Sequence, residues 1–249
     1  MVKAKKTPFI WGNVHHPFCA GCGHGIVTRL IAEVLEELDQ TENFIFTLGV
    51  GCSCNIHHFF KGDKLQCAHG RAAAMATGMK RVSPDTIIMT YQGDGDASAI
   101  GIAETLNAAY RNEKITAFVI NNALFGMTGG QMSWTTLPGM KTKTSVTGRD
   151  CSVTGEPMKL VELISSQFKV AYAARGSVHT AKDINKTKKY IKNALEAQLA
   201  GEGYSIVEFL SPCPTNLGIP PFDSLEWVKN KMLPYFPTGE FTPRRGTEK

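Results

Sequence analysis

The sequence lacks an apolar run long enough to span a membrane, so we expect no membrane partner. It also lacks a secretory signal: its first residues are basic, but the segment from Pro8 to Pro17 supplies no apolar core, which predicts a cytoplasmic protein. The net charge of +5 is spread between the N-terminus, a lysine-rich helix and the tail rather than gathered in a stripe. This spread argues against a nucleic-acid partner.

Seven cysteines are present, and in a cytoplasmic protein they argue against disulfides. Metal binding, redox chemistry and buried thiols are the roles that stay open for them. A chain of 249 residues can bury a sizeable core, and no internal repeat or second domain is visible. We therefore predict a single domain over residues 1–249.

Apolar strands alternate with amphipathic helices along the chain. This alternation predicts an α/β fold with a doubly wound, mostly parallel sheet. We expect an irregular loop over residues 1–24, the α/β core over 25–212 and a tail over 213–249. The expected strands are Asn43–Leu48, Thr86–Tyr91, Thr116–Ile120, Val170–Ala174 and Ser205–Leu210. The expected helices are 25–38, His69–Arg81, a run ending near Arg111, Met158–Phe168, Ala181–Ala200 and Ser224–Met232.

Several glycine-rich or polar segments follow predicted strands directly. In parallel sheets ligands bind at the carboxyl ends of the strands, so these segments should meet on one rim. They are Gly49–Cys54, Gly93–Asp96, Asn121–Met127 and Ser211–Cys213. Residues 126–156 show no clear periodicity, which is typical of a functional or partner-facing loop.

The segment Gly93-Asp94-Gly95-Asp96 lies between a predicted strand and a predicted helix. Glycines let the backbone approach an anion, and the start of a helix favours one. Asp94 would repel a diphosphate unless a divalent cation stood between them, and Mg²⁺ with oxygen ligands fits best. Asn122, at the end of the next strand, would add an amide oxygen. Taken alone, this pattern more often marks an ordinary strand-to-helix turn.

Cys19 and Cys22 form a CxxC pair within the irregular leader, and Cys52 and Cys213 both lie on the predicted rim. Four thiolates suit a [4Fe–4S] cluster or tetrahedral zinc, and unrelated buried thiols are the third possibility. Cys54 is the one rival to Cys52. The other cysteines, Cys67 and Cys151, are expected to be buried or incidental.

Together these segments resemble the β subunit of the 2-oxoacid:ferredoxin oxidoreductases, more the 2-oxoglutarate and branched-chain type than the pyruvate type. The resemblance covers roughly residues 14–237. The motifs that carry it are Phe18–Gly25, Gly49–Ser53, His69–Ala72 with Ala76–Lys80, Gly93–Asp96 with Ala99–Gly101, Asn122–Gln131 and Ser211–Asn216. Two departures stand out: Ala20 replaces the usual proline of the CxxC, and Cys54 occupies the place of a non-ligand.

The resemblance implies a set of site residues. The [4Fe–4S] ligands would be Cys19, Cys22, Cys52 and Cys213, and the Mg²⁺ ligands Asp94, Asn122 and the carbonyl of Leu124. Thiamine diphosphate would contact Val50, Gly51, Cys52, Ser53, His69, Arg71, Gly93, Gly95, Asp96, Gly126 and Met127. No side chain is a convincing general base, although His69 and Arg71 are candidates for a catalytic role.

The resemblance also implies the activity: coenzyme A-dependent oxidative decarboxylation of a 2-oxoacid, with electrons passing through the cluster to ferredoxin. The α subunit, with γ and δ subunits in some assemblies, would be the partner and would supply the glutamate that activates the cofactor. The chain alone should then be inactive. Two alternatives remain: a non-redox thiamine-diphosphate decarboxylase or synthase subunit, and a zinc-stapled subunit without catalysis.

Overall fold

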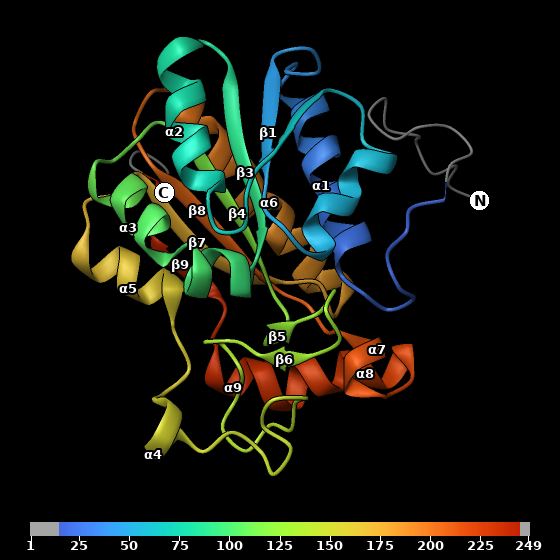
Figure 1. Ribbon diagram of the computed structural model, residues 1–249. Helices are drawn as coiled ribbons and strands as arrows, with labels where there is room; N and C mark the ends of the chain where they lie inside the picture. The colour runs from blue at the N-terminus through green and yellow to red at the C-terminus, as the bar shows by residue number, and fades with distance from the viewer. Residues whose placement is uncertain (1–14, 245–249) are drawn as a thin grey trace.

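A computed structural model describes residues 15–244, and its centre is a seven-stranded sheet. Six of the strands run parallel, and β9 pairs antiparallel with β7 at one edge (Figure 1). The strand order is β2 (Asp63–Gln66), β1 (Phe44–Leu48), β3 (Ile87–Gly93), β4 (Thr116–Asn121), β8 (Ser205–Leu210), β7 (Tyr172–Ser177) and β9 (Gly239–Thr242). The predicted mostly parallel α/β fold is confirmed.

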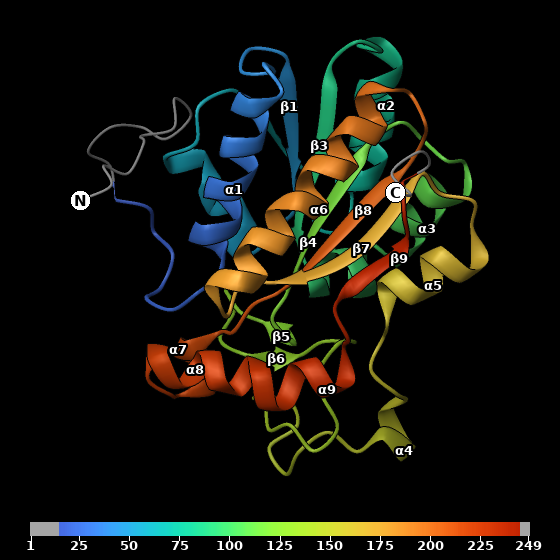
Figure 2. The same ribbon diagram turned by 180° about the vertical axis from the view of Figure 1, so that it is seen from behind.

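Helices cover both faces of the sheet, and the apolar strand residues alternate between them. Helices α1 (His24–Glu37) and α6 (Ala181–Leu199) pack on one face with Phe46, Tyr91 and Phe209 (Figure 2). Helices α2 (Ala72–Val82), α3 (Ile102–Tyr110) and α5 (Leu160–Gln167) pack on the other with Ile88 and Val119. Burial on both faces explains why these strands read as continuous apolar runs.

The carboxyl ends of the parallel strands point toward a third group of short elements, below the sheet in Figure 1. A small apolar core of Ala123, Leu137, Leu210, Val228, Met232 and Phe236 joins this group to the sheet. Its elements are β5 (Leu124–Phe125), β6 (Gln131–Met132), α4 (Cys151–Thr154), α7 (Pro214–Leu217), α8 (Pro221–Trp227), η3 (Val228–Met232) and α9 (Leu233–Tyr235). The predicted irregular segment 126–156 belongs here.

Several predicted boundaries were wrong. The helical run toward Arg111 is interrupted, because a π-helical turn, η2 (Gly95–Ile100), precedes α3. Gly101 marks the break: a Cβ there would lie 2.4 Å from the Gly70 carbonyl oxygen, so the backbones approach too closely for a side chain. The helix predicted from His69 begins at Ala72, and the strand predicted over Val170–Ala174 runs from Tyr172 to Ser177.

The two edge strands of the central sheet and the helix after β1 were missed, as were the short elements of the third group apart from the helix predicted over Ser224–Met232. Strand β2 is a short polar edge strand, and β9 is a short edge strand in the predicted tail. Neither contains an apolar run from which a strand could be predicted. The 3₁₀ helix η1 (Cys52–His58) follows β1. Residues 1–14 of the predicted leader loop and 245–249 of the predicted tail lie outside the described residues. No helix within residues 15–244 is both long and apolar enough to cross a membrane.

Candidate cofactor site

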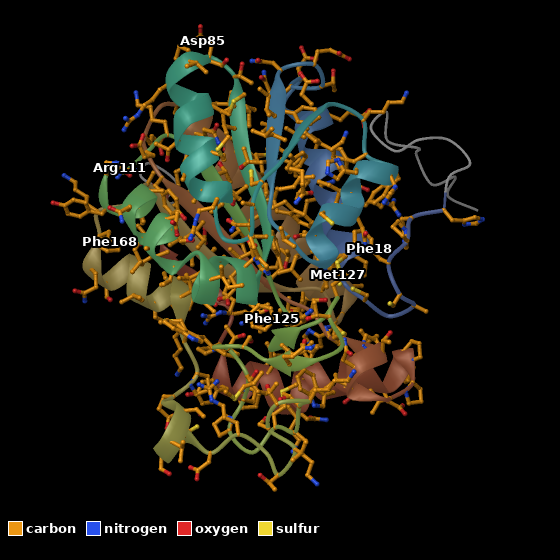
Figure 3. The ribbon with its side chains drawn as sticks, in the orientation of Figure 1. Phe18, Asp85, Arg111, Phe125, Met127 and Phe168 are labelled. Carbon is orange, nitrogen blue, oxygen red and sulfur yellow. The ribbon has the colours of Figure 1, made fainter. Side chains whose placement is uncertain are left out.

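An open pocket lies at the carboxyl edge of the sheet, with about 520 Å³ of empty space that includes open solvent. The loops that follow β1, β3 and β4 build it, which is the rim that the sequence predicted. Phe125 and Met127 lie at this edge in Figure 3. The lining residues are His24, Val50, Gly51, Cys52, Ser53, His69, Gly93, Asp94, Gly95, Asp96, Asn122, Leu124, Phe125, Gly126, Met127 and Thr128.

Asp94 lines the pocket as a buried carboxylate directly after β3. The same Asp94 oxygen accepts hydrogen bonds from the Ser133 hydroxyl, at 2.7 Å, and from the Thr135 hydroxyl. The backbone N–H of Asn122 also donates to this carboxylate. Burial raises the pKa of Asp94 to about 6, while these donors oppose the rise. A carboxylate so fixed is suited to ligate a cation.

The turn Asn121–Leu124 presents the second predicted metal ligand. The Asn121 side-chain oxygen accepts from the Ala123 N–H at 3.0 Å, and that of Asn122 accepts from the Leu124 N–H at 3.3 Å. Ala123 has a φ of 63°, in the left-handed region. This geometry turns Asn122 into the pocket lining, whereas Asn121 lies buried outside it.

Asp96 is fully engaged by protein donors. One oxygen accepts from the N–H groups of Val50 at 3.2 Å and Gly70 at 2.8 Å and contacts the His69 ring, and the other accepts from Gln92 at 2.6 Å. The carboxylate therefore ties the ends of three rim segments together. It lines the pocket as predicted, but its hydrogen bonds organise the loops and orient His69.

The pocket wall fits an anion such as a diphosphate. A Cβ built on Gly51 or Gly93 would meet no atom within 4 Å, so the backbone at both positions borders open space. The Ser53 hydroxyl is buried and has no hydrogen-bond partner within residues 15–244. Backbone close to open space and an unpaired hydroxyl are the groups that phosphate oxygens engage. The residues present therefore fit the diphosphate end of thiamine diphosphate.

Gly126 joins this wall to the cysteines. A Cβ at this position would lie 3.3 Å from the side-chain nitrogen of Asn122, 3.5 Å from the Cys52 sulfur and 3.7 Å from the Cys213 sulfur. Asn216 donates to both the Gly126 carbonyl, at 2.8 Å, and the Cys213 sulfur, at 3.2 Å. The space beside this one glycine is therefore bordered by the predicted magnesium ligand and by two predicted cluster ligands.

The thiols of the four predicted cluster ligands lie close enough to influence one another. Burial, and then the charges of Cys213, Cys52 and Cys19, raise the pKa of Cys22 to about 12. The pKa of Cys52 is raised to about 11, again chiefly by burial. Within residues 15–244, no three His, Cys, Asp or Glu side chains are arranged to hold a metal ion. The thiols are brought to one region without closing around a common centre.

The remaining cysteines occupy different surroundings. Cys54 is half-buried beside Cys52 in η1, so both rivals stand at the same wall. Cys67 is buried and points its sulfur at the Leu65 carbonyl oxygen, 3.5 Å away. Cys151 opens the short helix α4. Cys19, by contrast, is exposed.

Arg71 does not line the pocket, although it was predicted to contact the cofactor. It precedes α2, and its guanidinium pairs with Glu104 of α3 at 2.7 Å, with about half of the side chain exposed (47%). The ion pair with Glu104 therefore holds the guanidinium outside the pocket lining.

Sequence reasoning missed two kinds of site residue. His24 lines the pocket, hydrogen-bonds the Tyr91 hydroxyl at 2.8 Å and stacks on Phe18 with ring centres 4.8 Å apart. Burial lowers its pKa to about 3, so the ring is neutral. Its place directly after the CxxC was the available signal. Ser133 and Thr135 were missed because their stretch has no periodicity.

Comparison with known proteins agrees with this geometry. The family described as "Thiamine pyrophosphate enzyme, C-terminal TPP binding domain" matches residues 49–209. The chain is 43% identical over 227 residues to the ketoisovalerate oxidoreductase subunit VorA of Methanothermobacter thermautotrophicus, covering 91% of this chain and 48% of the relative. It is 35% identical over 228 residues to the 2-oxoglutarate synthase subunit KorB of Archaeoglobus fulgidus, covering 92% and 78%.

A solved structure of 2-oxoglutarate:ferredoxin oxidoreductase from Magnetococcus marinus, with 2-oxoglutarate, coenzyme A and succinyl-CoA bound, matches with a TM-score of 0.76 and 26% identity. The match covers 92% of this chain and 74% of that one. The chain spans about half the length of the ketoisovalerate oxidoreductase subunits that it matches. It belongs to the thiamine-pyrophosphate-binding subunit family of the 2-oxoacid:ferredoxin oxidoreductases, as the sequence predicted.

Proposed function

We propose that this chain is the cofactor-binding subunit of a cytoplasmic enzyme that converts a 2-oxoacid, coenzyme A and oxidised ferredoxin to acyl-CoA, CO₂ and reduced ferredoxin. The observation that carries the proposal is the position of Gly126: a Cβ built on this glycine would lie within 3.7 Å of the Asn122 side-chain nitrogen and of the sulfurs of Cys52 and Cys213. A magnesium–diphosphate site and a thiol group therefore share one wall. All seven cysteines carry free thiols, which supports a reducing compartment.

Each side of the pocket would hold one group. Asp94, Asn122 and the Leu124 carbonyl would ligate Mg²⁺, and Gly51, Ser53 and Gly95 would receive the diphosphate. Thiamine diphosphate supplies the electron sink that decarboxylation of a 2-oxoacid requires.

On the other side, Cys19, Cys22, Cys52 and Cys213 would hold a [4Fe–4S] cluster, which supplies a one-electron outlet. His24, buried and neutral, lies two residues after Cys22, hydrogen-bonded to Tyr91 and with its ring stacked on Phe18.

Among the described residues, the pocket offers no free carboxylate to act as a base. Asp96 is occupied by its protein donors, and Asp94 is committed to the metal. His69 contacts Asp96, which orients its ring. The base would therefore come from a partner subunit, and the complete active site would form between two chains.

The test is an anaerobic assay of ferredoxin reduction by the chain with and without its partner subunit. We expect turnover that requires coenzyme A and a 2-oxoacid in the complex, and none with the chain alone. Because the matched relatives are named for ketoisovalerate and for 2-oxoglutarate, these two oxoacids are the first substrates to compare. Turnover by the cluster-loaded chain alone would contradict the subunit role.

A further inference from the structure

A buried ion pair stands behind the rim, outside the pocket. Arg175 of β7 and Glu208 of β8 are register partners with exposed fractions of 0% and 1%. The Arg175 Nε donates to one Glu208 oxygen at 2.6 Å, and its other nitrogens pair with Glu162 and donate to the Pro237 carbonyl. Desolvating two charges costs free energy, so a fully buried ion pair is stable only when its remaining polar atoms are also hydrogen-bonded.

The second oxygen of Glu208 faces the rim. It accepts a hydrogen bond from the side-chain nitrogen of Asn121 at 2.7 Å, and Asn121 is itself completely buried. The side-chain oxygen of Asn121 accepts from the Ala123 N–H at 3.0 Å. Each polar atom of the Asn121 amide therefore has one partner, and the two partners lie on opposite sides of it.

Ala123 links the hydrogen bonds of Asn121 to the pocket, because its two neighbours in sequence line the pocket. Its left-handed conformation, with a φ of 63°, costs an L-residue free energy and needs support from its surroundings. The residues on either side of it are Asn122, whose N–H donates to Asp94, and Leu124. If Ala123 relaxed, the Asn122 amide and the Leu124 carbonyl would both leave their places at the pocket.

We propose that Arg175, Glu208 and Asn121 form a positioning network that holds the turn Asn121–Leu124 in its metal-binding conformation. The network touches neither the metal nor the cofactor. It orients the Asn121 amide, and through it the two ligands that the turn presents. This inference rests on the proposed magnesium–thiamine diphosphate site.

The test measures thiamine diphosphate binding to the full chain by calorimetry, with and without Mg²⁺, for Asn121→Ala and for Gln198→Ala. Gln198 is a matched control: it is also a buried amide, but it bonds Ile88 and Thr116 at the opposite edge of the sheet. We expect Asn121→Ala to weaken Mg²⁺-dependent binding by about 10- to 100-fold, as loss of a residue that orients metal ligands does. Gln198→Ala should lower the thermal midpoint and leave binding within about threefold.

A double variant, Asn121→Ala with Ala123→Gly, addresses the mechanism. Glycine adopts the left-handed conformation at no steric cost, so it should restore part of the lost binding. Binding by Asn121→Ala equal to wild type, or an equal loss in Gln198→Ala, would overturn the positioning role while the proposed function stood. Mg²⁺-independent binding by the wild-type chain, or no binding, would overturn both.

Discussion

The two sides of the pocket differ in how completely the chain builds them. On the magnesium side, Asp94 is buried and already held by Ser133, Thr135 and the Asn122 backbone. On the thiol side, Cys19 is exposed, and among residues 15–244 no three metal-binding side chains converge on one point. Hydrogen-bond donors of the protein hold the magnesium side in place. The cysteines of the thiol side lie in one region but are not arranged around a common point.

The difference follows from charge. A single carboxylate can be fixed by neutral hydroxyl and amide donors, which stabilise it without any metal. Burial disfavours a thiolate, and thiolates brought together also repel one another, which is why the pKa of Cys22 rises to about 12. Such a group closes only when a positive centre compensates the charge, so metal binding and local folding are coupled. Substitutions on the magnesium side should therefore change the binding of Mg²⁺ and thiamine diphosphate without changing the surrounding fold. Substitutions on the thiol side should change whether the four cysteines close around a metal.

Asp94→Asn should have the largest effect on the magnesium side. We expect a loss of at least about 100-fold in Mg²⁺-dependent thiamine diphosphate binding, measured by calorimetry, because a ligand is removed outright. The thermal midpoint should stay the same or rise, since the substitution removes a carboxylate that burial disfavours and keeps most of its shape.

Asp150→Asn is the matched control, because Asp150 is an exposed aspartate that caps α4 far from the pocket lining. It should bind like the wild type. If Asp94→Asn bound thiamine diphosphate normally, the magnesium side would not be where we place it.

Cys213→Ser should separate the two sides most clearly. We expect the anaerobically purified variant to lose most of its iron and its brown colour, because three thiolates no longer satisfy the cluster. Thiamine diphosphate binding should stay measurable and fall far less than in Asp94→Asn, since the substitution removes no Mg²⁺ ligand and Cys213 reaches the pocket wall only by way of Asn216 and Gly126.

The comparison variant is Cys54→Ser, which removes a neighbouring thiol from the same wall. Iron content and absorption spectrum should be unchanged in it. Iron retained in Cys213→Ser and lost in Cys54→Ser would move the ligand assignment to Cys54. Zinc in place of iron in the wild-type protein would support the zinc-stapled alternative.

The same contrast explains what the sequence could predict. The glycine-rich strand ends are local signals, and residues from the segments after β1, β3 and β4 line one pocket as predicted. The polar edge strand β2 carries no such signal, because it is half exposed and lacks an apolar run. The position of Arg71 outside the pocket lining could not be predicted, because its side chain pairs with Glu104, which belongs to another helix; its contact with the cofactor stays a prediction.

The missed site residues depend on contacts between distant parts of the chain. His24 meets Tyr91, and Thr135 meets Asp94 from a segment without periodicity. A hydroxyl that will hold a carboxylate looks like any surface hydroxyl in the sequence. The residues that the chain uses to organise its magnesium side are therefore the ones that pattern alone does not reveal.

Thr135→Val tests how much of that organisation comes from one hydroxyl. The substitution keeps the side-chain shape and removes a donor to Asp94, so we expect about tenfold weaker Mg²⁺-dependent binding in calorimetry. Thr142→Val in the same irregular segment is the control, because among residues 15–244 the Thr142 hydroxyl forms hydrogen bonds only with Ser145. Equal binding by both variants would mean that the Ser133 hydroxyl is sufficient to hold Asp94.

Lys188→Met should have the smallest effect. Lys188 lies where α6 packs against α1 and does not line the pocket. Its ammonium group contacts Glu33 and Glu37, each at 2.8 Å. Binding should not change, and the free energy of unfolding at pH 7 should fall by only about 0.5 kcal/mol, because the groups are partly exposed.

The pH dependence of this small effect has a definite sign. The Lys188 hydrogen bond lowers the pKa of Glu37, and it lowers the pKa of Glu33 against the opposing effect of burial. A carboxylate with a lowered pKa contributes stability above its ordinary value, about 4.5, and loses it as the pH falls through the lowered one. Denaturant unfolding should therefore distinguish Lys188→Met from wild type at pH 7, and the difference should shrink as the pH falls below 4.5. A difference that did not shrink in acid would assign the effect to packing of the lysine stem instead of its charge.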